Sequence, residues 1–142
     1  MTRVREAVAT DAQPLAVLSA QLGYPADPAT IEKRLRDIGR HDGVVLVALG
    51  ENDAVRGFAH VVPLHFLIVE PFVDLAGLVV GETSRGLGVG KALLAGVETW
   101  SRRHGFASVR VRSNVIRERA HRFYLREGYA ENKRQAVFVK RL

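Results

Sequence analysis

The chain contains no cysteine among its 142 residues. Disulfides, thiolate metal sites and a cysteine nucleophile are therefore excluded, and the composition fits a reducing cytoplasm. No apolar run approaches the ~20 residues that a membrane-spanning helix needs. Arg3, Arg5 and Glu6 interrupt any apolar run at the start, so no signal peptide is predicted. We therefore expect a cytoplasmic protein without a membrane partner.

Metal ligands are also scarce. The five histidines show no paired helical spacing, and no carboxylates cluster with them. No metal site is predicted.

Basic residues outnumber acidic ones by 21 to 15, which gives a net charge of +6. This excess suits either a nucleic acid or a coenzyme that carries several phosphates. The basic residues are scattered along the chain and lack the interleaved aromatic residues of a base-stacking surface. We favour a phosphorylated ligand and no nucleic acid partner, with a basic nucleic-acid-binding domain as the weaker alternative.

The length and patterning predict one α/β domain over residues 1–142. Thr10-x-x-Gln13 has the spacing of a capping box before the first helix, and Asp27-Pro28 predicts the start of the second. Strands that precede, separate and follow helices indicate one mixed sheet with helices on both faces. The predicted strands cover residues 4–8, 43–49, 54–62, 72–80, 107–111 and 135–140, and the predicted helices cover 11–22, 27–38, 89–103 and 117–127.

The most informative stretch begins with an apolar segment, 72–80, whose only charge is Asp74. This pattern is typical of a strand buried on both faces. Three glycines follow within five residues, at Gly86, Gly88 and Gly90, and an amphipathic helix begins there. Glycines let backbone N–H groups approach an anion, which also feels the positive end of the helix dipole. The segment predicts a pyrophosphate-binding loop, although a plain turn remains the alternative.

The spacing of the glycines excludes two common phosphate-binding motifs. A Walker A motif would need a glycine at Arg85 and a hydroxyl at Ala92, and the dinucleotide fingerprint would need its third glycine at Lys91. What fits is Arg85-x-x-Gly88-x-Gly90 after an apolar strand. In this pattern the chain resembles the GNAT superfamily of acyl-CoA-dependent N-acyltransferases, whose coenzyme loop reads Gln/Arg-x-x-Gly-x-Gly/Ala.

A second group of residues carries the same resemblance. Asn114 follows a predicted strand, and Ala120 lies one turn before Tyr124 on the same face of the next helix. In the family an asparagine and a tyrosine so placed flank the thioester end of the coenzyme. The alternative for Phe123-Tyr124 is simple packing against the sheet.

The resemblance implies a single-domain, GNAT-like mixed sheet, mostly antiparallel, with helices on both faces. It implies acetyl-CoA as co-substrate, and a primary amine of a small molecule or a peptide that attacks directly in a ternary complex. A homodimer is implied because dimers are frequent in the family, and the first two helices should help to form the acceptor pocket. The implied coenzyme-binding residues are Leu78, Val79, Val80, Arg85, Gly86, Leu87, Gly88, Val89, Gly90, Lys91, Asn114 and Tyr124.

The chemistry needs a proton donor for the departing thiolate and a base for the amine. A tyrosine near the sulfur can donate, so Tyr124 is the candidate acid. Many family members carry a glutamate where this chain has Ala76. Asp74 lies two residues further back, on the same face of a regular strand. It is then the candidate base, with His60, His65 or ordered water as alternatives. An inactive acyl-CoA-binding protein is the alternative that the missing glutamate leaves open.

Overall fold

The computed structural model describes residues 2–142, which divide into two compact units. The first unit ends at Arg112 and the second is Ser113–Leu142. The sheet and the glycine-rich loop belong to the first unit, whereas Asn114 and Tyr124 belong to the second. None of the helices in residues 2–142 is long and apolar enough to cross a membrane.

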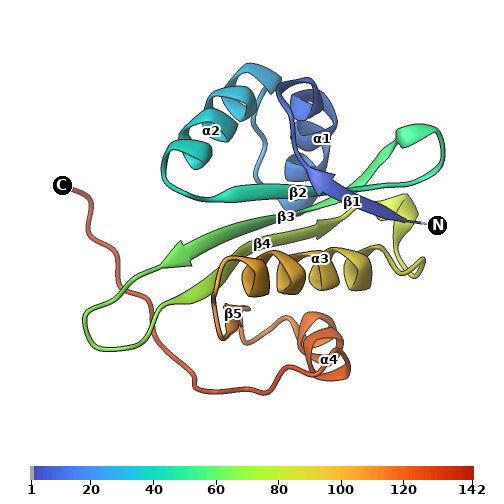
Figure 1. Ribbon diagram of the computed structural model, residues 1–142. Coiled ribbons are helices and arrows are strands. Elements are labelled where there is room, and N and C mark those ends of the chain that lie inside the picture. The colour runs from blue at the N-terminus through green and yellow to red at the C-terminus, as the bar shows by residue number, and fades with distance from the viewer. Residues whose placement is uncertain (1) are drawn as a thin grey trace. The chain divides into compact units, whose positions relative to one another are not determined.

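The first unit contains a five-stranded sheet in which the strands lie in sequence order (Figure 1). The first four strands are antiparallel, and only the last pair is parallel. The prediction of a mixed, mostly antiparallel sheet is thus confirmed. The strands are β1 (Arg3–Glu6), β2 (Val44–Leu49), β3 (Val55–Leu64), β4 (Phe72–Val80) and β5 (Val109–Val111).

Helices cover both faces of this sheet, as predicted. In Figure 1, α1 (Ala12–Leu22) and α2 (Pro28–Arg40) lie on one side of the strands and α3 (Val89–Arg103) lies on the other. Leu15 of α1 packs with Val47 and Leu49 of β2 on the first face. On the opposite face β3 approaches α3 so closely that a Cβ on Gly57 would lie 3.1 Å from Leu93 Cδ1.

Local signals set several helix ends. The Asp27 side chain accepts a hydrogen bond from the Thr30 N–H at 2.8 Å and caps α2, with Pro28 in the first turn, as the sequence predicted. Gly105 follows α3 with φ of +82°, where a left-handed residue ends the helix. Short 3₁₀ turns occupy Ala9–Asp11, Glu51–Asp53 and Glu82–Ser84.

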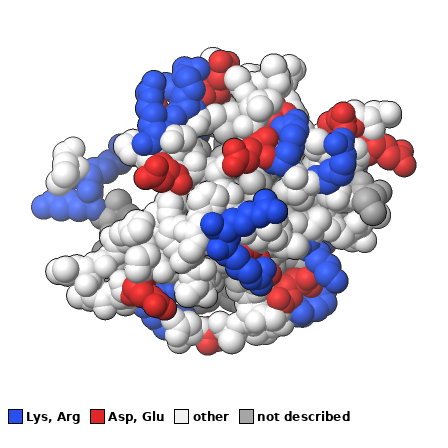
Figure 2. Space-filling view, in the orientation of Figure 1, with Lys and Arg blue, Asp and Glu red and all other residues white. Residues whose placement is uncertain are grey.

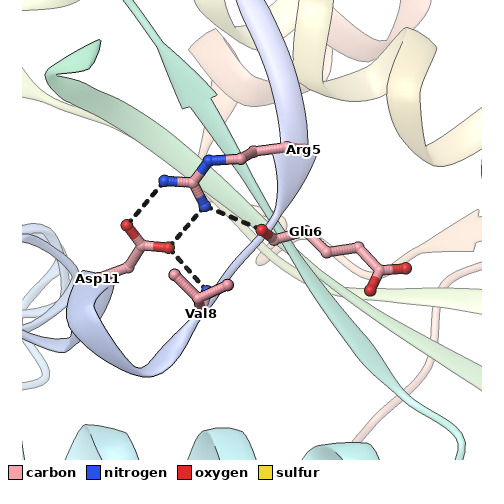
Figure 3. A network of polar contacts seen from close by, with 4 residues as sticks. All are labelled: Arg5, Glu6, Val8 and Asp11. Atoms are coloured by element: carbon pink, nitrogen blue, oxygen red, sulfur yellow. Dashed lines mark hydrogen bonds and ion pairs between the residues drawn. The ribbon is translucent and has the colours of Figure 1, made fainter.

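The predicted capping box at Thr10 and Gln13 is wrong, because Asp11 organises this turn instead. In Figure 3 both Asp11 carboxylate oxygens accept from the Arg5 guanidinium, at 2.8 and 3.0 Å. Asp11 Oδ2 also accepts from the Val8 N–H at 2.8 Å, and Arg5 donates to the Glu6 carbonyl at 2.9 Å. Asp11 is buried, and these partners stabilise its negative charge. They join β1 to the start of α1.

We predict that Asp11→Ala lowers the free energy of unfolding by about 2 kcal/mol at pH 7, since it removes charge-assisted bonds and leaves the Val8 N–H without its acceptor. The hydrogen bonds from Arg5 lower the pKa of Asp11 from its ordinary value of 3.8. This stabilisation is therefore present above pH 3.8 and is lost as the pH falls below it. Urea unfolding should show that the difference in unfolding free energy between variant and parent becomes smaller at acid pH.

Asp37→Ala is the matched control, because it removes the carboxylate of a surface ion pair with Arg40 on α2. It should change the unfolding free energy by less than about 0.5 kcal/mol. An Asp11→Ala effect no larger than this would contradict the assigned role.

A β-bulge interrupts β4 at Ala76. His60 of β3 is opposite Gly77, while the next residue, Val61, is opposite Leu75. Ala76 is therefore the extra residue, with no partner in β3, and it is exposed. The bulge reverses the alternation that put Asp74 and Ala76 on one face in the sequence-based argument.

The second unit contains α4 (Glu118–Arg126), close to the predicted helix. The predicted strand over 135–140 is wrong. Residues 130–142 are irregular and almost all exposed within the described chain. Residues such as Val137, Phe138 and Val139 favour a strand, but a strand also needs a hydrogen-bonded neighbour, and residues 113–142 contain no other strand that could pair with this segment.

Candidate active site

The glycine-rich loop adopts the backbone conformation that the sequence predicted. Gly86 and Gly88 have φ of +78° and +80°, a left-handed region that L-amino acids rarely adopt. A Cβ built on either glycine would meet no heavy atom of residues 2–142 within 4 Å. Glycine is thus required here by the backbone angles rather than by crowding.

The loop leads directly into the N-terminus of α3, with Gly88 at the cap position. No side chain of the described chain caps this end, and no acidic residue lies in its first turn. Its first N–H groups are therefore available, at the positive end of the helix dipole. Arg85 and Lys91 are exposed on either side. This arrangement fits a diphosphate in charge and in hydrogen-bond donors.

The end of β4 offers a second set of backbone groups. Leu78, Val79 and Val80 pair with β3 on one side only. On the other side β5 pairs with β4 at Val73 to Leu75, and within residues 2–112 no strand continues that edge toward Val80. An extended molecule that carries amides, such as pantetheine, can pair with such an edge.

Asp74 is buried in β4, and its Oδ2 accepts from Arg112 Nη2 at 2.7 Å. This partner, which follows β5, was not predicted. The ion pair explains how a lone carboxylate is tolerated in an apolar strand.

His60 lies close to the bulge, opposite Gly77. It shares a face of the sheet with Asp74, because Asp74 is opposite Val62, two residues along the same strand. Burial lowers the pKa of His60 from 6.5, and the charge of Asp74 acts in the opposite direction. His60 is therefore neutral at pH 7 and able to accept a proton. His65 is exposed in the loop after β3.

Tyr124 lies on α4 in the second unit. Its ring packs edge-on against Phe123 and Tyr129, with centroid separations of 5.2 and 5.9 Å. Burial raises the pKa of its phenol above 10.0, so the proton is retained at neutral pH. Asn114 accepts a hydrogen bond from the Ile116 N–H at 3.2 Å through its side-chain oxygen, and its carbonyl lies 3.0 Å from His121 Nε2.

One contact that sequence reasoning missed involves Gln21 of α1. Its side-chain oxygen accepts from the Glu82 N–H at 3.1 Å and so ties this helix to the turn between β4 and the glycine-rich loop. No cluster of histidine and acidic side chains that would suit a metal ion occurs in the described part of the chain.

Residues 11–129 match the Acetyltransferase (GNAT) family. The chain belongs to the GNAT acetyltransferase family. It is therefore an acyltransferase, and acetyl-CoA is the co-substrate of this family. The resemblance based on the glycine-rich loop and on Asn114 to Tyr124 is confirmed.

Two relatives support the assignment over most of their length. The chain is 30% identical over 139 residues to an aminoglycoside N(6′)-acetyltransferase type 1 of Stenotrophomonas maltophilia, covering 95% of this chain and 90% of that one. It is 31% identical over 107 residues to the uncharacterized N-acetyltransferase YhdJ of Bacillus subtilis (strain 168), covering 75% of each.

A solved GNAT structure shows the same fold. The aminoglycoside N-acetyltransferase AAC(6′)-Iy in complex with CoA aligns with a TM-score of 0.88 at 21% identity, covering 100% of this chain and 96% of that one.

Proposed function

We propose that this GNAT protein is an acetyl-CoA-dependent N-acetyltransferase that acetylates a primary amine of a small molecule or a peptide by direct attack in a ternary complex. The observation that carries the proposal is the left-handed glycine turn at the uncapped N-terminus of α3. Because the family match spans both units, we propose that residues 1–142 work as one domain.

In this proposal the residues of the loop, from Arg85 to Lys91, bind the diphosphate, with Leu87 and Val89 contributing through their backbone. The free edge of β4 from Leu78 to Val80 pairs with the pantetheine amides, and Asn114 and Tyr124 flank the thioester. The coenzyme supplies the activated acetyl group. Tyr124 holds a proton at neutral pH and donates it to the departing thiolate.

For the base we propose that Asp74 acts with His60. His60, neutral at pH 7, accepts the proton of the acceptor ammonium, and the buried charge of Asp74 stabilises the imidazolium that forms. Arg112 holds the carboxylate in place. This pair substitutes for the glutamate that Ala76 replaces.

The test of the function is a CoA-release assay against amino acids, polyamines, aminoglycosides and peptides. Aminoglycosides come first, because the Stenotrophomonas maltophilia relative is named for them. Acetyl-CoA alone should raise the melting temperature. A rise in melting temperature without CoA release for any amine would favour an acyl-CoA-binding protein. Strongly salt-dependent binding of nucleic acid, with no rise in melting temperature on addition of acetyl-CoA, would favour a nucleic-acid-binding domain.

The roles of His60 and Asp74 predict distinct pH profiles of kcat/KM. His60→Gln should remove the acidic limb, which lies below pH 6.5 because burial lowers the pKa of His60. Asp74→Asn should move the limb to lower pH, since the charge that raises that pKa is lost. His65→Gln is the control and should leave the profile unchanged. If Asp74→Asn loses the acidic limb while His60→Gln keeps it, Asp74 is the base itself.

The cysteine-free sequence is compatible with the cytoplasm, where we place the proposed reaction. We also propose a homodimer, because dimers are frequent in the family.

A further inference from the structure

The position of the glycine-rich loop is set chiefly at its two ends. A Cβ on Gly86 or Gly88 would meet no heavy atom of the first unit within 4 Å, so little packing supports the middle of the loop. At one end, Val89 Cγ1 of α3 would lie 3.1 Å from a Cβ on Gly57 of β3, so the helix packs against the sheet. At the other end, the loop follows the 3₁₀ turn Glu82–Ser84. The contacts that hold this turn therefore help to set where the loop N–H groups lie.

The turn is held by hydrogen bonds within the first unit. The Gly81 N–H donates to the Arg56 carbonyl of β3 at 2.8 Å, and the Ser84 N–H donates to the Gly81 carbonyl at 2.9 Å. The Glu82 N–H donates to the side-chain oxygen of Gln21 at 3.1 Å. Because Gln21 belongs to α1, this last bond joins the turn to a helix rather than to the sheet.

A glycine in the turn lets α1 approach closely enough for this bond. A Cβ on Gly81 would lie 3.2 Å from the Arg56 carbonyl oxygen and 3.3 Å from Leu18 Cδ2. Leu18 and Gln21 are three residues apart on α1 and so share a face of the helix. The turn thus receives an apolar contact and a hydrogen bond from the same face of α1.

We propose that Gln21 is a positioning residue for coenzyme binding. Its hydrogen bond to the Glu82 N–H holds the turn in the conformation that orients the loop N–H groups toward the diphosphate. This role rests on the proposed function, since the diphosphate must bind at the loop. Gln21 carries no charge, so its contribution to affinity should not depend on salt.

Calorimetric titration with acetyl-CoA tests this role. Gln21→Leu removes the accepting oxygen and should raise the dissociation constant by about 3- to 10-fold, the size expected for the loss of one hydrogen bond. Gln13→Leu makes the same substitution at another exposed position of α1 and should stay within about twofold of the parent. A Gln21→Leu protein that binds acetyl-CoA as tightly as the parent overturns the role.

Glu82→Pro provides a background in which Gln21 should not matter. Proline has no N–H to donate and fixes φ at about −65°, which suits the first position of a helical turn. Gly81 has φ of −57° and ψ of 145°, an extended conformation that is allowed before proline. In this background Gln21→Leu should change the dissociation constant by less than about twofold. A loss as large as in the parent background overturns the role, because Gln21 would then act without the Glu82 N–H.

Hydrogen exchange followed by NMR examines the bond without any coenzyme. The Glu82 amide should exchange faster in Gln21→Leu than in the parent, whereas the Gly81 amide, bonded to Arg56, should keep its rate. Unchanged exchange at Glu82 in this variant overturns the role, whatever its affinity. If the Glu82 amide behaves as expected but the parent binds no acetyl-CoA, the proposed function is overturned and the role with it.

Discussion

Tyr124→Phe is expected to lower kcat by about 100- to 1000-fold while the KM for acetyl-CoA stays nearly constant. The substitution keeps the ring that packs against Phe123 and Tyr129 and removes only the proton that we assign to the departing thiolate. General acid catalysis of this kind contributes roughly 10²- to 10⁴-fold. Because burial raises the pKa of the phenol, the parent should keep its turnover through neutral pH and lose it only on the alkaline side of the ordinary tyrosine range.

Tyr129→Phe provides the matched control, since it removes a phenol from the same aromatic cluster. It should leave kcat within about twofold of the parent, because we give Tyr129 no part in the chemistry. Steady-state kinetics with one acceptor and varied acetyl-CoA measures both variants. Unchanged turnover in Tyr124→Phe would remove the tyrosine from the mechanism, and an equal loss in both variants would point to packing.

Gly88→Val is expected to raise the dissociation constant of acetyl-CoA by about 10- to 100-fold. A β-branched residue strains the left-handed φ of +80°, which costs about 1–2 kcal/mol. Relaxation of that strain would rotate the loop N–H groups away from the diphosphate. Calorimetric titration with acetyl-CoA and with CoA measures the effect, and both ligands should lose affinity equally, because both carry the same diphosphate.

Gly105→Val is the control that separates backbone strain from the loss of coenzyme binding. Gly105 has φ of +82° at the other end of α3, and a Cβ there likewise meets nothing within 4 Å among the described residues. Both variants should lose similar unfolding free energy, but only Gly88→Val should lose coenzyme affinity. Equal affinities for the two variants would rule out the loop as the diphosphate site.

The parts of the fold that were predictable are those encoded by local patterns. The apolar run 72–80, the glycines after it and the cap at Asp27 each depend on residues within a few positions, and each occurs in the structure as expected. The family resemblance followed from short motifs of the same kind, at Arg85 to Gly90 and at Asn114 to Tyr124.

What the sequence did not reveal depends on residues far apart in the chain. Asp74 looked like a lone buried acid because its partner, Arg112, lies 38 positions away, just after β5. The capping box predicted at Thr10 and Gln13 had suitable spacing. In the structure the turn is instead stabilised by the Asp11 carboxylate, which accepts hydrogen bonds from Arg5 of β1. The strand over 135–140 was predicted from composition, although a strand depends on an available neighbour as much as on its own residues.

The bulge at Ala76 has a consequence for how this enzyme can change over evolutionary time. Since Ala76 lies outside the ladder with β3 and is exposed, a different side chain there removes no cross-strand bond and displaces no buried neighbour. Descendants can thus gain or lose an acidic group at this position while the sheet persists. A single codon change can place a carboxylate at this exposed position of β4 and leave the architecture of the sheet unaltered.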